Sequence, residues 1–253
     1  MIKWLTNREN AKYVFCLRIL YGVAVGAVMC AFYMLCGYLD FGKLCFALIG
    51  AAVPVMMSGG IYLSGFMKTS ETLAGRVFGK EDAEASGKAA PGKSDFSAKA
   101  GYAGTQAAIA AMTFYLLYAG GLSEVREDRQ LAFLCIGYMI SRTLYGMAFV
   151  WFPEAEKEKG KGRRGDTVLT PALRKALRII LSVILALCFC SCLVSEPIMG
   201  MLEALLCMWV WTYYYYMSKK LFGGVTKESA GYFLTLCELA LALFAGMFGS
   251  ALL

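Results

Sequence analysis

Residues 58 to 73 read Ser-Gly-Gly-Ile-Tyr-Leu-Ser-Gly-Phe-Met-Lys-Thr-Ser-Glu-Thr-Leu, where a long apolar run gives way to a polar and basic segment. Gly59, Gly60 and Gly65 allow two backbones to approach closely at a membrane surface. The polar side chains of this stretch are expected to face whatever binds there. The stretch therefore predicts a functional site at one edge of the membrane.

The composition is typical of a membrane protein, because 59 % of the 253 residues are hydrophobic and only 17 % are charged. Seven apolar segments have the length of about 20 residues that a bilayer-crossing helix needs. They fall near 15–36, 42–64, 101–121, 131–152, 176–195, 197–217 and 230–252. We therefore expect an all-α, polytopic helical membrane protein with about seven transmembrane helices, forming a single domain over residues 1–253.

The distribution of Lys and Arg predicts the orientation of the chain. The connecting segments on one side of the expected spans carry 21 of these residues, and those on the other side carry 3. The positive-inside rule then places the amino terminus in the cytoplasm. The cytoplasmic loops are expected at 65–100, 153–175 and 217–229. The charged run at 154–166 either marks topology and attracts anionic lipid, or captures an anionic substrate.

Cysteine and histidine usage limits the chemistry. Almost all of the ten cysteines lie in apolar runs, and no two Cys-x-x-Cys pairs occur, which argues against disulfides and structural zinc. The chain contains no histidine. Catalysis would therefore use carboxylates, cations, hydroxyls or a hard metal ion.

Three ionisable residues, Arg142, Glu203 and Glu238, lie inside expected spans. Because isolated charges in a bilayer are costly, we expect them to face the bundle interior and to pair, Arg142 with Glu238 or Glu203. Such a pair either fixes helix packing only or lines a site. A small transporter that uses these residues as a polar pathway is one alternative function, although the sequence lacks the internal repeats that would favour it.

Small residues at helical spacing predict close contacts between helices. They occur as Gly22-x-x-x-Gly26 near the amino terminus and as Gly246-x-x-Gly249 near the carboxyl terminus.

Two distant stretches, 59–71 and 223–228, each begin with a double glycine and continue with polar groups. Together with Ser141-Arg142, Phe152-Pro153 and the run at 230–239, they resemble the cobalamin synthase family, the adenosylcobinamide-GDP ribazoletransferases. The resemblance covers nearly the whole chain in the same order. It is most specific where Leu-Phe-Gly-Gly-Val-Thr-Lys-Glu-Ser-Ala-Gly-Tyr-Phe, at 221–233, is close to the family's Phe-Gly-Gly-Ile-Thr-Gly-Asp-x-Ala-Gly-x-Phe.

The resemblance implies a Mg²⁺-dependent transferase of cobalamin biosynthesis at the cytoplasmic face of the bacterial inner membrane. The family joins α-ribazole, or its 5′-phosphate, to adenosylcobinamide-GDP, makes adenosylcobalamin or its phosphate, and releases GMP. The expected partners are these small molecules, membrane lipid and other cobalamin-assembly proteins, with no nucleic acid.

The resemblance also assigns roles to residues of this chain. The catalytic residues would be Glu71, Glu228 and Lys68, and the magnesium ligands Glu71, Glu228 and Asp95. The substrate-binding residues would be Gly59, Gly60, Ser64, Gly65, Arg142, Gly223, Gly224, Thr226 and Lys227.

The chain departs from the family's first motif, Gly-Gly-x-His-x-Asp-Gly-x-x-Asp-x-x-Asp. Tyr62 replaces the histidine, Ser64 and Lys68 replace two aspartates, and Glu71 replaces the third. The family's Thr-Gly-Asp becomes Thr-Lys-Glu at 226–228. Each lost carboxylate removes one metal ligand and one negative charge. A further alternative is therefore a family member without catalysis, a pseudoenzyme that binds a corrinoid or a protein partner.

Overall fold

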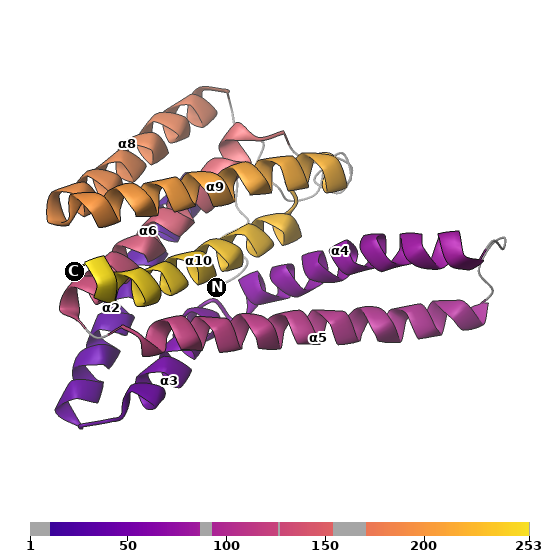
Figure 1. The fold of residues 1–253 in the computed structure, drawn as a ribbon. Coiled ribbons are helices and arrows are strands. Elements are labelled where there is room, and N and C mark those ends of the chain that lie inside the picture. The colour runs from indigo at the N-terminus through magenta and orange to yellow at the C-terminus, as the bar shows by residue number, and fades with distance from the viewer. Residues whose placement is uncertain (1–10, 87–92, 126, 154–170, 253) are drawn as a thin grey trace.

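The structure, a computed structural model, describes residues 11–86, 93–125, 127–153 and 171–252. These residues form eight helices and no strand, which confirms the all-α fold class. The helices are α2 (Ala11–Tyr38), α3 (Lys43–Met57), α4 (Ile61–Ser86), α5 (Lys93–Ser123), α6 (Asp128–Trp151), α8 (Pro171–Ser195), α9 (Pro197–Phe222) and α10 (Lys227–Leu252) (Figure 1).

Four of the described helices are long and apolar enough to cross a membrane, and a fifth span results if the bent pair α3 and α4 counts as one. The described helices therefore account for several membrane crossings. The count of about seven spans and the side of the amino terminus stay predictions.

Helices α6 and α10 form the centre of the bundle. Helix α10 contacts α4, α5, α6 and α9, and α6 also contacts α2 and α8. One apolar core, which includes Leu181 and Phe233, lies between α6, α8, α9 and α10. A second core, which includes Met29 and Leu122, joins α2, α3 and α5 to the other side of α6. The central position of α10 brings its first turn next to several other elements.

The expected span at 42–64 is not a single straight helix, because the chain breaks between α3 and α4. The two helix axes differ in direction by 93°. Gly59 and Gly60 have φ values of +61° and +72°, which residues with a Cβ rarely adopt. A Cβ at either glycine would meet no atom within 4 Å. These two glycines are therefore required by the turn and not, as predicted, by a close backbone contact.

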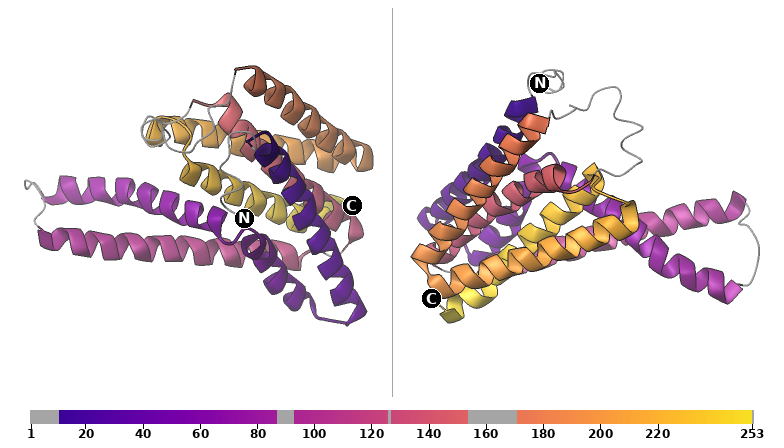
Figure 2. Two further views of the ribbon diagram at one scale, coloured as in Figure 1. Left: turned by 180° about the vertical axis from the view of Figure 1, so that it is seen from behind. Right: turned by 90° about the horizontal axis from the view of Figure 1, so that it is seen from above.

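The predicted loop at 65–100 is also wrong, since most of it is helical. Helix α4 continues to Ser86, and α5 begins at Lys93. The two helices run side by side and project beyond the rest of the bundle (Figure 1, Figure 2). The site-bearing stretch therefore lies on the base of a long helical hairpin.

The other two predicted loops are shorter than expected in the part that the structure describes. Helix α9 ends at Phe222 and α10 begins at Lys227, so that only residues 223–226 connect them. Helix α8 begins at Pro171, within the predicted loop 153–175. The charged run at 154–166 lies outside the described residues.

The predicted close contacts of Gly22, Gly26 and Gly246 are confirmed. A Cβ at Gly22 would lie 3.0 Å from the carbonyl oxygen of Tyr138, and one at Gly26 would lie 3.3 Å from the Cβ of Cys135. A Cβ at Gly246 would lie 2.2 Å from a carbonyl oxygen of α5. These glycines let α2 approach α6, and α10 approach α5.

Candidate functional site

The first turns of α4 and α10 pack directly against each other. A Cβ at Gly65 would lie 2.9 Å from the carbonyl oxygen of Glu228 and 3.2 Å from the Cα of Gly231. The close approach predicted for Gly65 is therefore confirmed. This contact places the two distant stretches, 59–71 and 223–228, at the same end of the bundle.

The connection between α9 and α10 is held by hydrogen bonds of its backbone groups to the Ser218 side chain and to Pro153. Gly223, with φ of +68°, ends α9 in the left-handed conformation that favours glycine. The Ser218 hydroxyl donates to the carbonyl oxygen of Gly224 at 2.7 Å. The Val225 N–H donates to the carbonyl oxygen of Pro153 at 2.9 Å. Pro153, just after α6, is thereby held beside the double glycine.

Helix α10 begins with a reciprocal cap. The Ser229 N–H donates to the Thr226 hydroxyl oxygen, and the Thr226 N–H donates to the Ser229 hydroxyl oxygen, each at 3.0 Å. The next two side chains, Lys227 and Glu228, are exposed. The positive end of the helix dipole lies at this turn, so the site favours anionic groups.

The other predicted site residues of α4 lie next to Gly65 or farther along the helix. The Ser64 hydroxyl donates to the carbonyl oxygen of Ile61 at 2.8 Å, within its own helix. Lys68 is exposed, and Glu71 is half-buried. Because a helix rises 1.5 Å per residue, Glu71 lies about 9 Å farther along α4 than Gly65.

The structure does not bring Asp95 to this end of the bundle. Helices α4 and α5 are antiparallel (Figure 1), and Asp95 lies in the first turn of α5. The helical rise puts it about 20 Å from Glu71 along the hairpin. Its side chain lies outside the described residues.

The described carboxylates do not form a magnesium site by themselves. Within the described ranges, no group of three or more His, Cys, Asp or Glu side chains is placed to hold a metal ion. Mg²⁺ takes six oxygen ligands in near-octahedral geometry. Glu71 and Glu228 could supply only part of this set of oxygen ligands.

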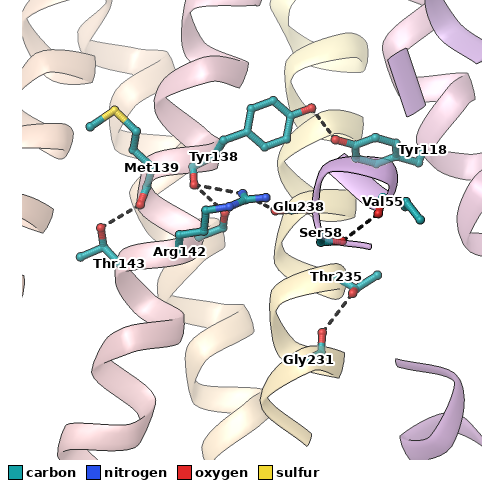
Figure 3. A network of polar contacts seen from close by, with 11 residues as sticks. Val55, Ser58, Tyr118, Tyr138, Met139, Arg142, Thr143, Gly231, Thr235 and Glu238 are labelled. Carbon is teal, nitrogen blue, oxygen red and sulfur yellow. Dashed lines mark hydrogen bonds and ion pairs between the residues drawn. The ribbon is translucent and has the colours of Figure 1, made fainter. Parts of the chain in front are cut away.

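The predicted pairing of Arg142 is confirmed with Glu238 and not with Glu203. The Arg142 guanidinium donates to the Glu238 carboxylate and, at 3.3 Å, to the carbonyl oxygen of Tyr138 (Figure 3). The exposed fractions of the two charged side chains are only 2 % and 8 %. The pair therefore joins α6 to α10 inside the bundle, as the cost of a lone intramembrane charge requires.

Glu203 faces the interior, as predicted, but in a different part of the bundle. It is 2 % exposed, and one carboxylate oxygen lies 3.5 Å from the position of a Cβ built on Gly137. The Cys192 side chain lies beside the carboxyl group. Its second oxygen has no hydrogen-bond partner among the described residues. The carboxyl group lies between α6, α8 and α9.

A small cleft lies under the break between α3 and α4. Its polar side chains are Ser58, Tyr62, Tyr118, Thr235 and Glu238. Figure 3 shows Ser58, Tyr118 and Thr235 near the Arg142–Glu238 pair. The hydroxyls of Tyr118 and Tyr138 are hydrogen-bonded to each other. The cleft connects the glycine turn to the buried ion pair.

Sequence reasoning missed two polar residues of this region. Ser229 completes the cap of α10, and the spacing Thr-x-x-Ser at a helix start is a signal that would have identified it. Thr69 lies one turn after Gly65 and is 1 % exposed, and its hydroxyl has no hydrogen-bond partner among the described residues. No sequence pattern marks Thr69.

These features define the chain as a multi-pass helical membrane protein with two glycine-rich segments that meet at one end of the bundle. A family model described as cobalamin-5-phosphate synthase matches residues 98–246. This match covers more than half of the 253 residues, and the chain belongs to the cobalamin synthase family.

A curated relative gives a longer alignment. The chain is 28 % identical over 245 residues to the adenosylcobinamide-GDP ribazoletransferase of Lachnoclostridium phytofermentans, an alignment that covers 96 % of this chain and 86 % of the relative. No solved structure matches the chain. The pseudoenzyme and transporter alternatives gain no support from these comparisons.

Proposed function

We propose that this chain is an adenosylcobinamide-GDP ribazoletransferase. It joins α-ribazole, or its 5′-phosphate, to adenosylcobinamide-GDP and releases GMP. The observation that carries the proposal is the contact of Gly65 with Glu228 and Gly231, which unites the two stretches of the family resemblance. The family match and the relative's activity support the same reaction.

The substrate phosphates bind at the end of the bundle where α4 and α10 begin. Four exposed cations support this placement: Lys68, Lys219, Lys220 and Lys227. Their charge attracts an anionic diphosphate, and the first turn of α10 adds its helix dipole. The corrinoid and the ribazole are the small-molecule partners of this surface.

The reaction breaks the bond between one phosphorus atom and the oxygen that bridges the two phosphates. A hydroxyl of α-ribazole forms the new bond to that phosphorus, and GMP leaves with the bridging oxygen. The attacking hydroxyl loses its proton to a carboxylate, for which Glu71 and Glu228 are the candidates at this end. Lys68 offsets negative charge on the transferred phosphoryl group.

The proposal also places this end of the bundle on one side of the membrane. The excess of Lys and Arg on one side of the predicted spans supports the cytoplasmic face of a bacterial inner membrane for this end of the bundle. Lipid contacts and association with other cobalamin-assembly proteins are further parts of the proposal.

GMP release tests the reaction directly. Purified protein in nanodiscs receives adenosylcobinamide-GDP and α-ribazole, with α-ribazole 5′-phosphate in a parallel series, and GMP is measured by chromatography. We expect GMP release in wild type, a loss of about 100-fold or more in the variant that lacks the base, E71Q or E228Q, and unchanged release in R129Q at the opposite end. A wild-type protein that releases no GMP at any magnesium concentration overturns the proposal.

The magnesium concentration is varied in this assay. The triple variant S64D/K68D/E228D restores aspartate at three positions of the family motifs. Faster magnesium-dependent turnover in this variant would support metal binding at this end. Unchanged turnover and magnesium dependence would count against a magnesium site at this end of the bundle.

A further inference from the structure

Two thiols from different helices face each other where α2 packs against α6. Cys30 lies on α2 and Cys135 on α6, and their Sγ atoms are 3.3 Å apart. The Cys135 thiol also donates to the carbonyl oxygen of Gly26 at 3.4 Å. Neither cysteine contributes to the site described above, so the pair is independent of the proposed function.

The packing of α2 against α6 holds the two thiols in this position. Gly22 stands opposite Tyr138, and Gly26 stands opposite Cys135, so the two helices are antiparallel. Side chains lean toward the amino terminus of their own helix. In an antiparallel pair, the Cys30 and Cys135 side chains therefore lean toward each other across the contact.

A disulfide has an S–S distance of about 2.05 Å, so its formation would require the two sulfur atoms to approach by about 1.3 Å. Rotation of two side chains supplies a shift of this size when the backbones are already close. A Cβ at Gly26 would lie only 3.3 Å from the Cβ of Cys135, which shows how closely the helices pack at this level.

Both thiols lie in segments that are apolar enough to cross the membrane, Leu20–Tyr38 and Asp128–Trp151. Each cysteine is half-buried, so part of its surface is open to a lipid-soluble reagent. We propose that Cys30 and Cys135 form a reversible disulfide that links α2 to α6, with a membrane-dissolved quinone as the oxidant.

The reaction balances in atoms and electrons. Each thiol loses one hydrogen atom, and one S–S bond forms. The quinone accepts two electrons and two protons and becomes the quinol. A dithiol reductant reverses the reaction by thiol–disulfide exchange.

The link would restrict α2, the described helix that contacts only α6 and α3 to any large extent. Helix α3 leads directly into the glycine turn at 58–60. Oxidation would thus link α2 covalently to α6 at the centre of the bundle. It would also lower the conformational entropy of the unfolded chain, because the disulfide closes a long loop.

Mass spectrometry tests the link on the full-length protein in nanodiscs. The protein is incubated with decylubiquinone without oxygen, alkylated with N-ethylmaleimide and digested. We expect a peptide pair that joins Cys30 to Cys135 and a mass loss of about 2 Da for the two hydrogen atoms removed. Dithiothreitol should abolish both signals.

Three variants and a second oxidant complete the test. C30S and C135S should lose the crosslink, whereas C190S, which removes an exposed thiol on α8, should keep it. Size-exclusion chromatography identifies any variant that fails to fold. If one fails, the crosslinked peptide pair found in wild type by mass spectrometry still shows which cysteines are joined. Copper–phenanthroline oxidises neighbouring thiols irrespective of quinone access.

Full alkylation of Cys30 and Cys135 after both oxidants would overturn the pairing. A crosslink with copper–phenanthroline alone would overturn the quinone as the oxidant. A crosslink that forms with decylubiquinone in wild type and C190S, but not in C30S or C135S, is the result we expect.

Discussion

Arg142 on α6 donates to the carboxylate of Glu238 on α10 across the centre of the bundle. The Arg142 guanidinium also lies over the rings of Tyr21 and Tyr138, with distances of 5.3 and 5.7 Å to the ring centroids. A Cβ at Gly22 would lie 3.0 Å from the Cδ of Arg142. One cation therefore connects α2, α6 and α10 by an ion pair, ring contacts and close packing.

Removal of one partner of this pair should destabilise the protein strongly. We expect R142Q or E238Q to lower the free energy of unfolding by about 3–5 kcal/mol, because each leaves an uncompensated buried group. The double variant R142M/E238L should recover most of this loss. Unfolding of all four proteins, measured in the same detergent, compares the loss in each single variant with that in the double variant. Single variants as stable as wild type would contradict the prediction.

The contact between α4 and α10 should tolerate no side chain at Gly65. We expect G65A to cost about 1–3 kcal/mol of stability, since its methyl group would meet the Glu228 backbone. GMP release should fall with it if the proposed site is correct. The matched control is G120A on α5, where a Cβ meets nothing within 4 Å. G120A should be neutral or stabilising by up to about 1 kcal/mol, because alanine favours helices.

The cap of α10 should depend on the hydroxyl of Thr226. We expect T226A to lower stability by about 1 kcal/mol, since the Ser229 N–H loses its acceptor. T226S keeps a hydroxyl and should stay within a few tenths of a kcal/mol of wild type. Thermal unfolding of the three proteins distinguishes these outcomes. Equal losses in T226A and T226S would assign the effect to the methyl group of Thr226.

The ion pair of Arg129 and Glu196 at the other end of the bundle should contribute little. The Arg129 side chain is 66 % exposed, so solvent and salt screen the charges. We expect R129Q to change stability by no more than about 1 kcal/mol. Thermal unfolding of R129Q and R142Q under one condition compares an exposed ion pair with a buried one. A loss in R129Q as large as that in R142Q would contradict the screening argument.

The sequence was sufficient for the helical fold and for several contacts within it. An apolar composition limits the chain to helices in a bilayer, and an intramembrane Arg142 has to find a carboxylate. The choice of Glu238 over Glu203 was open, because the sequence does not give the rotation of α9 and α10 about their axes. That rotation results from packing of the whole bundle.

The helical hairpin of α4 and α5 was missed because polarity was given more weight than helix propensity. Residues 76–86 contain Lys, Glu and Ala, which favour helices although they are polar or small. The break at 58–60 was missed for a different reason. A glycine pair fits both a close helix contact and a left-handed turn, and only the backbone geometry distinguishes the two.

The candidate site was predicted in part. The sequence identified both glycine-rich stretches and Gly65 as a contact residue, and the structure places these stretches side by side. It could not show that Asp95 lies far along the hairpin, because residues 65–100 were expected to form a loop and not two long helices. The roles of Glu71, Glu228 and Lys68 stay predictions.

Gly65 and Gly231 also restrict how this chain can change over generations. Each faces the backbone of the opposite helix, so an added methyl group at one cannot be accommodated by a smaller residue at the other. A substitution at either position is therefore expected to impair folding and to be removed by selection. Ser64 and Lys68 are exposed on the same helix, so substitutions that change the charge at these positions need not move α4. The contact that assembles this end of the bundle can thus persist while the exposed residues around it change.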